Sequence, residues 1–285
     1  MKSSTIYVRL SFFILAIAFA YPAAAQMTST FMSGAMYGHY YHYVDPVWLY
    51  EKRRDEGRDV SSFQREKDGV GLPFAQFEIT RRLVRMNSTD ETIAADSSST
   101  INTKTTFKFS FNGSSSWEVG KMGSKASLML TTGIASNFWK FQEKNVDLTS
   151  EFGPKEFSLW QLCIPVTFDY KFGAEAKMSK SMKTGYTVGF GPCLVMSSAT
   201  CTDGASATYF KAAPYLKMSY GFFWHTFLSV EATALTGSFS FMDNNPSADF
   251  SRDNGFENNT FYTLKSGSVF TFGITWMPFS FDWEE

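Results

Sequence analysis

Two stretches decide the fold: Phe157–Gly173 (FSLWQLCIPVTFDYKFG) and Gly185–Met196 (GYTVGFGPCLVM). In both, bulky apolar side chains occupy the even positions, and small or polar side chains occupy most odd positions. A period of two predicts extended strands with one apolar face and one polar face. The connecting stretch Ala174–Thr184 is short and basic. We therefore expect a hairpin whose apolar face meets hydrocarbon and whose polar face lines an interior, as in a membrane β-barrel.

The same alternation divides the chain from Leu72 onward into eight predicted strands. They are Leu72–Arg85, Lys104–Phe111, Ser124–Ile134, Phe157–Gly173, Gly185–Ser198, Ala207–Phe222, Trp224–Gly237 and Tyr262–Phe279. Short connections such as Asn112–Gly123 alternate with long polar ones such as Ser238–Phe261, an asymmetry typical of outer-membrane barrels. A soluble β-sandwich would share the periodicity with its apolar face inside. Long strands, loop asymmetry and an aromatic C-terminal strand favour an all-β, antiparallel, up-and-down transmembrane β-barrel of about eight strands.

Composition narrows the possible partners. The chain has 285 residues, a formal net charge of -1 and 18% aromatic residues. Because there is no basic stripe or net positive field, we expect no nucleic-acid partner. His39 and His42 raise the possibility of a metal site, but no carboxylate or cysteine stands at a ligand spacing, which favours two surface imidazoles. We expect neither a metal nor a cofactor.

The N-terminus has the pattern of a signal peptide. Lys2 and Arg9 form a basic start, Leu10–Ala20 is apolar, and three alanines ending at Ala25 fit a cleavage site before Gln26. The pattern predicts that residues 1–25 are removed after export. No later run of ~18 uninterrupted apolar residues exists, so we expect any membrane span to consist of strands in the bacterial outer membrane.

Between the signal peptide and the predicted barrel domain Leu72–Glu285, the segment Gln26–Gly71 is expected to be a polar N-terminal extension. Asp45 is a candidate N-cap, and Pro46 suits the first turn of a helix. These two residues predict one short helix over Val47–Arg58.

A family resemblance appears in the deciding stretches. Trp160–Gly173 (WQLCIPVTFDYKFG) resembles the strand LEIPLLLKYKFG of the PorT-like outer-membrane β-barrel domain family of Bacteroidota, and Val188–Val195 (VGFGPCLV) is similar to its strand AGPYVGYLL. Between them, Ala174–Thr184 stands where that family has a lysine-rich periplasmic turn. Cys163 stands where the family strand has an acidic residue directly before Ile-Pro. The resemblance implies an outer-membrane barrel of a diderm bacterium, and the family's named member is tied to protein secretion.

Two predicted registers bring particular side chains together. A tight corner at Phe222–Trp224 allows a register in which Lys217 lies opposite Glu231 on the polar face, where the two would form an ion pair; a register shorter by two is the alternative.

The second register concerns the cysteines. If Tyr170 lies opposite Tyr186, Cys163 lies opposite Cys193, and an exported protein could form a disulfide there. A bond between Cys193 and Cys201 across a short loop is the competing possibility.

Function stays open among three classes. The first is a non-enzymatic barrel that anchors surface loops in a structural or interaction role. The second is an accessory subunit of an envelope or protein-secretion machine, and the third is a small-solute channel, although a barrel of about eight strands is filled by its own side chains. An outer-membrane hydrolase or acyltransferase needs a histidine near the external rim, and His225 falls at a periplasmic corner. Expected partners are outer-membrane lipid, envelope proteins, and the barrel-assembly machinery, through the C-terminal aromatic strand.

Overall fold

The computed structural model describes residues 46–58, 64–87, 89, 92–144, 155–247, 251–253 and 256–283. The chain divides into two units, Met1–Val60 and Ser61–Glu285, which we treat separately. The predicted signal peptide, most of the N-terminal extension, and both His39 and His42 lie outside the described residues.

The first unit contains helix α3 (Pro46–Asp55), which confirms the helix predicted over Val47–Arg58 except for its last three residues. Proline suits the first helical position, because its missing N–H would have no partner there. Gly57, with φ of 62°, follows the helix, and its amide donates to the Arg54 carbonyl at 2.9 Å. No helix in the described residues is long and apolar enough to cross a membrane.

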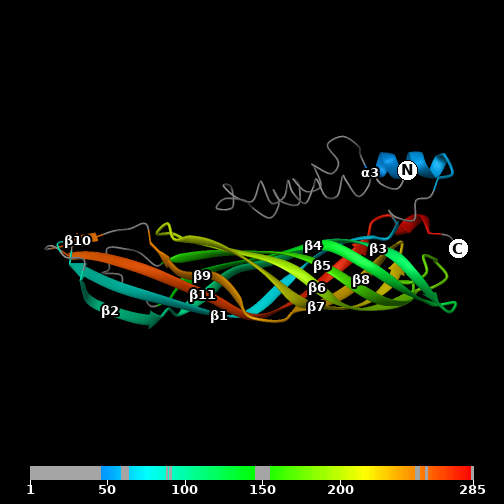
Figure 1. Ribbon diagram of the computed structural model, residues 1–285. Coiled ribbons are helices and arrows are strands. Elements are labelled where there is room, and N and C mark those ends of the chain that lie inside the picture. Colours follow the sequence, from blue (N-terminus) through cyan, green and yellow to red (C-terminus); the bar gives the residue numbers. More distant parts are fainter. Residues whose placement is uncertain are drawn as a thin grey trace. The chain divides into compact units, whose positions relative to one another are not determined.

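The second unit is a closed antiparallel β-barrel (Figure 1). Its strands are β1 (Glu66–Asn87), β2 (Ile93–Thr100), β3 (Thr103–Met122), β4 (Ala126–Glu143), β5 (Glu156–Gly173), β6 (Thr184–Cys201), β7 (Ser206–Trp224), β8 (Thr226–Leu235), β9 (Phe239–Pro246), β10 (Ser251–Asp253) and β11 (Phe256–Met277). Neighbours along the chain pair from β3 to β8, β8 pairs with β11, and β11 pairs with β1, which closes the wall against β3.

Eight strands form the wall, which confirms the predicted fold class: β1, β3 to β8, and β11. The other three extend it at one end. Strand β2 pairs with the second half of β1. Strand β9 pairs with β11 beyond the point where β8 stops, and β10 pairs with the start of β11. We call this the loop end. The opposite end, where the three hairpin turns and the start of β1 and end of β11 lie, is the turn end (Figure 1).

All eight predicted strands are present, but several bounds were wrong. Strand β1 begins at Glu66, so the last residues assigned to the N-terminal extension belong to the barrel. Asn112–Gly123 was predicted as a turn, yet β3 continues to Met122 and the turn is confined to three residues. Gly123, with φ of 77°, allows this tight reversal because glycine adopts positive φ without steric cost. The stretch Asn112–Met122 was predicted as a loop because it is rich in serine and glycine, yet it pairs with β4.

Both predicted registers are wrong by two residues. Phe172, not Tyr170, lies opposite Tyr186, and the two rings stack with centroids 5.2 Å apart. The cause is the turn: Gly173 takes φ of 66° and pairs with Gly185, which sets where β6 starts. At the next corner, Trp224 pairs with Thr226, and one residue, His225 at φ of 57°, makes the reversal.

The outer surface near the turn end is an apolar belt, which confirms the predicted lipid-facing even positions. In β5 and β6, for example, Phe168 and Phe190 are 58% and 60% exposed. The belt continues around the wall with Val70, Leu72, Phe74, Val119, Met122, Val166, Tyr186, Val188, Leu194, Leu216, Met218, Tyr220, Phe222, Val230, Phe270, Phe272 and Ile274. Between these residues, polar side chains such as Asp169 point inward and are buried. A hydrocarbon-facing exterior with a polar interior is the arrangement of a transmembrane barrel.

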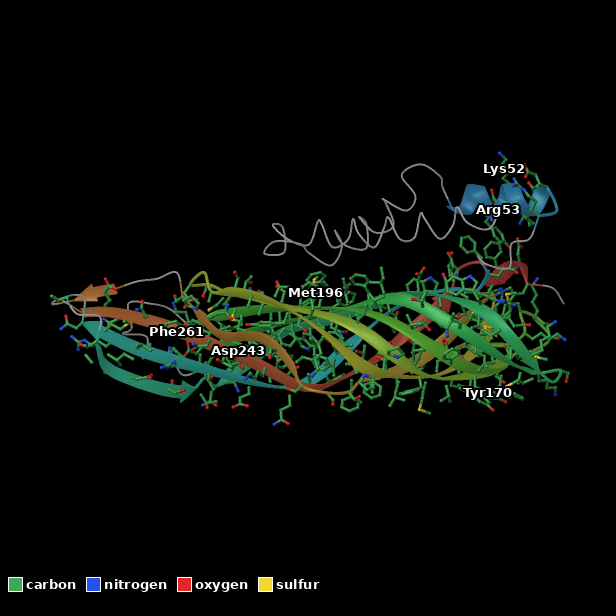
Figure 2. The ribbon with its side chains drawn as sticks, viewed as in Figure 1. Lys52, Arg53, Tyr170, Met196, Asp243 and Phe261 are labelled. Carbon is green, nitrogen blue, oxygen red and sulfur yellow. The ribbon has the colours of Figure 1, made fainter. Side chains whose placement is uncertain are left out.

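Toward the loop end this polarity inverts, which the sequence reading did not anticipate. Phe157 and Leu159 occupy inward positions of β5 and are almost fully buried, while Ser158 between them is exposed. Along the barrel axis, Figure 2 labels Tyr170 in the turn half and Phe261 in the loop half. The predicted polar interior therefore extends through only part of the barrel, and the rest has the apolar core and polar exterior of a soluble β protein.

Candidate functional site

A polar network fills the lumen in the turn half, with Asp169 at its centre. One carboxylate oxygen of Asp169 accepts a hydrogen bond from Thr131 at 2.6 Å and forms an ion pair with the Lys217 ammonium at 2.7 Å. The other oxygen accepts from Thr167 at 2.7 Å. All four side chains are buried. A carboxylate in a dry interior is tolerated because it is paired and hydrogen-bonded in this way.

Two further lysines extend the network. Lys171 donates to Ser116 at 2.9 Å, and Lys67 forms an ion pair with Glu175 at 2.7 Å. Glu175 lies in the turn after β5 and also accepts from Ser219 on β7 at 2.9 Å, so it ties the turn across the barrel mouth. In the turn half, buried lysines and carboxylates thus occur in matched numbers: Lys67, Lys171 and Lys217 with Asp169, Glu175 and Glu231.

The predicted ion pair between Lys217 and Glu231 is not formed. The observed register places Ser219 opposite Glu231 and Thr233 opposite Lys217. Lys217 therefore bonds to Asp169 of β5 over Gly189 of β6, while Glu231 accepts from Asn112 at 2.9 Å. Sequence reasoning identified both charges as lumen residues but missed Asp169 as the partner, because the contact reaches over Gly189 of β6 and requires the registers of two strand pairs at once.

A glycine makes room for this network. A Cβ at Gly189 would stand 2.1 Å from the nearer Asp169 oxygen and 3.4 Å from the Lys217 side chain. The carboxylate therefore occupies the space that a side chain on β6 would take. The glycines of Gly189–Gly191 in β6 thus make room for neighbouring groups in a crowded interior.

The predicted direct pairing of Cys163 with Cys193 is wrong. Cys163 lies opposite Val195, and Cys193 lies opposite Pro165. The two cysteines are thus diagonal neighbours whose buried thiols lie close enough to hydrogen-bond, so a disulfide between them stays a prediction. All three cysteines are buried free thiols. The alternative bond to Cys201 is unsupported, since Cys193 and Cys201 lie on the same extended strand.

Above the polar network, an apolar core closes the lumen in the loop half. It comprises Ile79, Ile101, Trp139, Phe141, Phe157, Leu159, Cys163, Cys193, Val195, Ala199, Cys201, Ala205, Ala213, Tyr215, Leu235, Phe239, Phe241, Met242, Tyr262, Leu264 and Val269. A cavity of about 20 Å³ remains between the two zones, lined in part by Asn112, Asn137 and Tyr215. That volume has room for about one water molecule.

At the loop end, Asp203 joins several connections. It lies in the turn between β6 and β7, accepts a hydrogen bond from Tyr262 of β11 at 2.5 Å, and lies 3.7 Å from the Lys155 ammonium. Its backbone carbonyl also accepts from Ser247 at 3.2 Å. Burial alone would raise the pKa of Asp203, but the Tyr262 hydroxyl and the Lys155 charge hold that pKa below its ordinary value.

At the turn end, the C-terminal residues leave the wall. Strand β11 ends at Met277, and the short 3-10 helix η1 (Ser280–Asp282) follows. Trp283 is buried and stacks on Phe227 with ring centroids 5.7 Å apart. Phe279, predicted as the last residue of the strand, is likewise buried outside it. The aromatic C-terminus therefore contributes to closing this end rather than continuing as one lipid-facing strand.

His225 is at the β7–β8 corner of the turn end, as predicted. Within the described ranges, no three His, Cys, Asp or Glu side chains gather in a way that could hold a metal ion. The buried carboxylates are already bonded to lysines, hydroxyls and an amide.

No family model and no curated protein matches this chain. Among solved structures, it is similar to the outer membrane protein OprG of Pseudomonas aeruginosa, at 10% identity and a TM-score of 0.36, over 74% of this chain and 94% of that one. It is also similar to the outer membrane protease OmpT of Escherichia coli, at 12% identity and a TM-score of 0.31, over 74% of this chain and 96% of that one. A third similar structure is the attachment invasion locus protein Ail of Yersinia pestis, at 7% identity and a TM-score of 0.28, over 72% of this chain and 99% of that one.

The exterior of the barrel decides its location. Each of the eight wall strands pairs with two neighbours around the cylinder, and the belt presents apolar side chains on its outside. The chain is a β-barrel of the bacterial outer-membrane type.

Proposed function

We propose that the protein is a non-enzymatic outer-membrane anchor that holds its loop half outside the cell as an interaction surface. The observation that carries this proposal is the sealed lumen. Polar bonding closes the turn half, the apolar core closes the loop half, and the cavity between them has the volume of about one water. With the interior filled, the surface of the loop half is the part left to meet partners.

Strand β2 supports this role. All eight of its residues are exposed, and among the described strands it pairs with β1 alone. An exposed strand edge offers unpaired backbone groups on which an extended segment of another protein can add as a further strand. Short turns are periplasmic in outer-membrane barrels, so β2 is assigned to the cell exterior.

Cysteine labelling on intact cells tests the topology. Ser98→Cys in β2 should react with a membrane-impermeant maleimide, whereas Lys180→Cys in the β5–β6 turn should react only after the outer membrane is permeabilised. The three native cysteines are buried and give a low background. Labelling of Lys180→Cys alone on intact cells would reverse the orientation and contradict the proposal.

Conductance separates the anchor from a small-solute channel. Full-length protein in planar lipid bilayers should give no stepwise current, because the lumen offers no continuous aqueous path. Reproducible single-channel steps that survive repurification would favour the channel instead.

A more specific role is supported by the resemblance of Trp160–Val195 to PorT-like barrels of Bacteroidota. On that basis we propose, as a second candidate, that the barrel is an accessory subunit of an envelope or protein-secretion machine. Support rests on the sequence of β5 and β6 alone. Deleting the gene should then reduce secretion of exported cargo, and pull-downs from native outer membranes should recover envelope proteins. Normal secretion in the deletion strain would leave the anchor as the remaining proposal.

Barrel assembly supplies a further proposed partner. Assembly machinery would have to engage β11 before the barrel closes, since β11 pairs with both β1 and β8 in the finished wall. We propose that the outward aromatic residues of β11, Phe270 and Phe272, take part in that recognition. Replacing both with Ser should lower the yield of inserted protein in cells while leaving refolding in detergent possible.

A further inference from the structure

Strands β1 and β3 separate for part of their length. Backbone pairs join Glu66–Gly71 to β3, and Thr80–Met86 to β2. Between these ladders no backbone pair joins Leu72–Glu78 to Asn102–Phe109, although the structure describes every residue of both segments. We call this opening the seam. It closes again where the Ile101 amide donates to the Ile79 carbonyl at 2.8 Å.

The sequence explains why the wall opens here. Pro73 has no N–H to donate to a neighbouring strand, so the ladder cannot continue past it in regular form. On the other side of β1, the pairing with β11 shifts between Ala75 and Phe77, which is a β-bulge. Strand β1 is therefore irregular on both sides along the same stretch.

The seam crosses the upper boundary of the apolar belt. Along β1, Leu72 and Phe74 are exposed apolar residues, and Gln76 and Glu78 beyond them are exposed polar residues. Along β3, the run Lys104–Phe107 is exposed at every position, whereas a residue in a closed wall alternates between inside and outside. The opening therefore lies at the depth where hydrocarbon gives way to lipid headgroups.

Lys108 reaches through the seam. Ser110 and Asn112, on the same face of β3, are inward-facing residues. The Lys108 ammonium nevertheless lies 3.3 Å from the centre of the Phe74 ring, which is 43% exposed on the outer surface. A cation over an aromatic face is favourable, but the ring uses only part of the donor capacity of an ammonium.

No carboxylate neutralises this cation within the described residues. Neither Lys108 nor the exposed Lys104 forms an ion pair there, in contrast to the three lysines of the lumen. Glu78, at the upper end of the seam, is not ion-paired with either lysine in the described part of the chain. Two positive charges thus stand beside exposed apolar rings at headgroup depth.

We propose that the seam binds the phosphate of an outer-leaflet glycolipid, with Lys108 and Lys104 holding the headgroup and an acyl chain lying against Phe74 and Phe107. The proposal rests on the outer-membrane placement and orientation given above. The rings supply an apolar surface directly below the charges, which matches an amphipathic lipid better than a free anion. A basic side chain at a membrane surface favours an anionic lipid by about fivefold.

The experiment uses the full-length barrel in nanodiscs and measures retained glycolipid by native mass spectrometry. The probes are lipid A with both phosphates and the same lipid after dephosphorylation. Lys104→Gln with Lys108→Gln should weaken binding of the phosphorylated probe about 25-fold. The matched control is Lys121→Gln with Lys125→Gln at the other end of the same hairpin, where both lysines are exposed, and it should stay within about twofold of wild type.

Replacing both seam lysines with Arg should restore binding, since the positive charge is kept. Undiminished binding by the double Gln variant, or equal retention of the dephosphorylated lipid, overturns the proposal. Displacement of the lipid by an equal concentration of inorganic phosphate overturns the lipid as the ligand. A separate gel measurement records whether unboiled protein migrates faster than boiled protein. Loss of that shift contradicts the barrel itself, whereas a retained shift without lipid binding refutes only the seam proposal.

Discussion

Lys217 offers a direct test of the observed register, because two different carboxylates compete to be its partner. The structure places its ammonium 2.7 Å from Asp169, whereas the register expected from the corner would have placed it opposite Glu231. The side chain of Asp169 is fully buried, and that of Lys217 is 10% exposed. Breaking such a pair from one side leaves an uncompensated charge, which costs about 3–5 kcal/mol.

Two double-mutant cycles measure which partner counts. Lys217→Met and Asp169→Asn should each destabilise the barrel by about 3–5 kcal/mol, and the double variant should cost less than their sum by about 2–3 kcal/mol. In the second cycle, Lys217→Met with Glu231→Gln should show a coupling below about 1 kcal/mol, since Glu231 is bonded to Asn112. Guanidinium unfolding in phospholipid vesicles, followed by tryptophan fluorescence, supplies the free energies.

The two coupling energies, Lys217 with Asp169 and Lys217 with Glu231, are then compared. A coupling with Glu231 equal to or larger than that with Asp169 would refute the register of β7 against β8 and the description of the lumen network. Heat-dependent migration of each variant on gels serves as the control that every protein compared is a closed barrel.

Three further outcomes follow from the same geometry. Phe190→Arg in the belt should lower the free energy of unfolding by about 2–4 kcal/mol. In the same assay, Thr208→Arg on the polar exterior should stay within about 0.5 kcal/mol of wild type. Equal losses in the two variants would contradict the belt. Gly189→Ala should lose about 1–3 kcal/mol because its Cβ displaces the Asp169 carboxylate, and an unchanged midpoint would contradict that crowding. The pKa of Asp203 is lowered in the fold, so its stabilisation is present above the unfolded pKa of about 3.9 and is lost as the pH falls through the folded pKa. The protection factor of the β6–β7 turn amides, which is the intrinsic exchange rate at each pH divided by the measured rate, should therefore fall at acid pH in wild type, whereas Asp203→Asn should show a low protection factor that does not change with pH.

The sequence was sufficient for the fold because the signal for the wall is local. Each strand of the belt alternates with a period of two, as Phe168 and Phe190 illustrate, and each turn is marked by glycine or by a tight corner. The eight wall strands, their order and the lipid-facing positions of the turn half follow from these features.

Registers and lumen partners could not be read in the same way. A register depends on the backbone conformation of a few turn residues, such as Gly173 and His225, and a shift of two residues leaves the alternation unchanged. The sequence pattern therefore fits either register equally well. Asp169 of β5 meets Lys217 of β7 over Gly189 of β6, and this row of three residues is known only once the β5–β6 and β6–β7 registers are both known.

The inversion of polarity did leave a signal that was overlooked. Phe157 and Leu159 stand at odd positions of a strand whose other odd positions are mostly polar, and Phe239 and Phe241 repeat that pattern in β9. Reading each strand as two segments with opposite apolar faces would have predicted an apolar core beyond the membrane.

Strand length makes sense once both zones are recognised. Strand β5 has 18 residues, but a tilted strand needs only about 9–11 to cross the hydrocarbon of a bilayer. The remaining residues build the loop half, whose core of Phe157, Phe241, Leu264 and their neighbours is packed like that of a soluble protein. A chain that needed only a membrane anchor would not require this second core. Because the core includes Ile79 of β1 and Leu264 of β11, it orders these strands beyond the belt, as the proposed role of the loop half as an interaction surface requires.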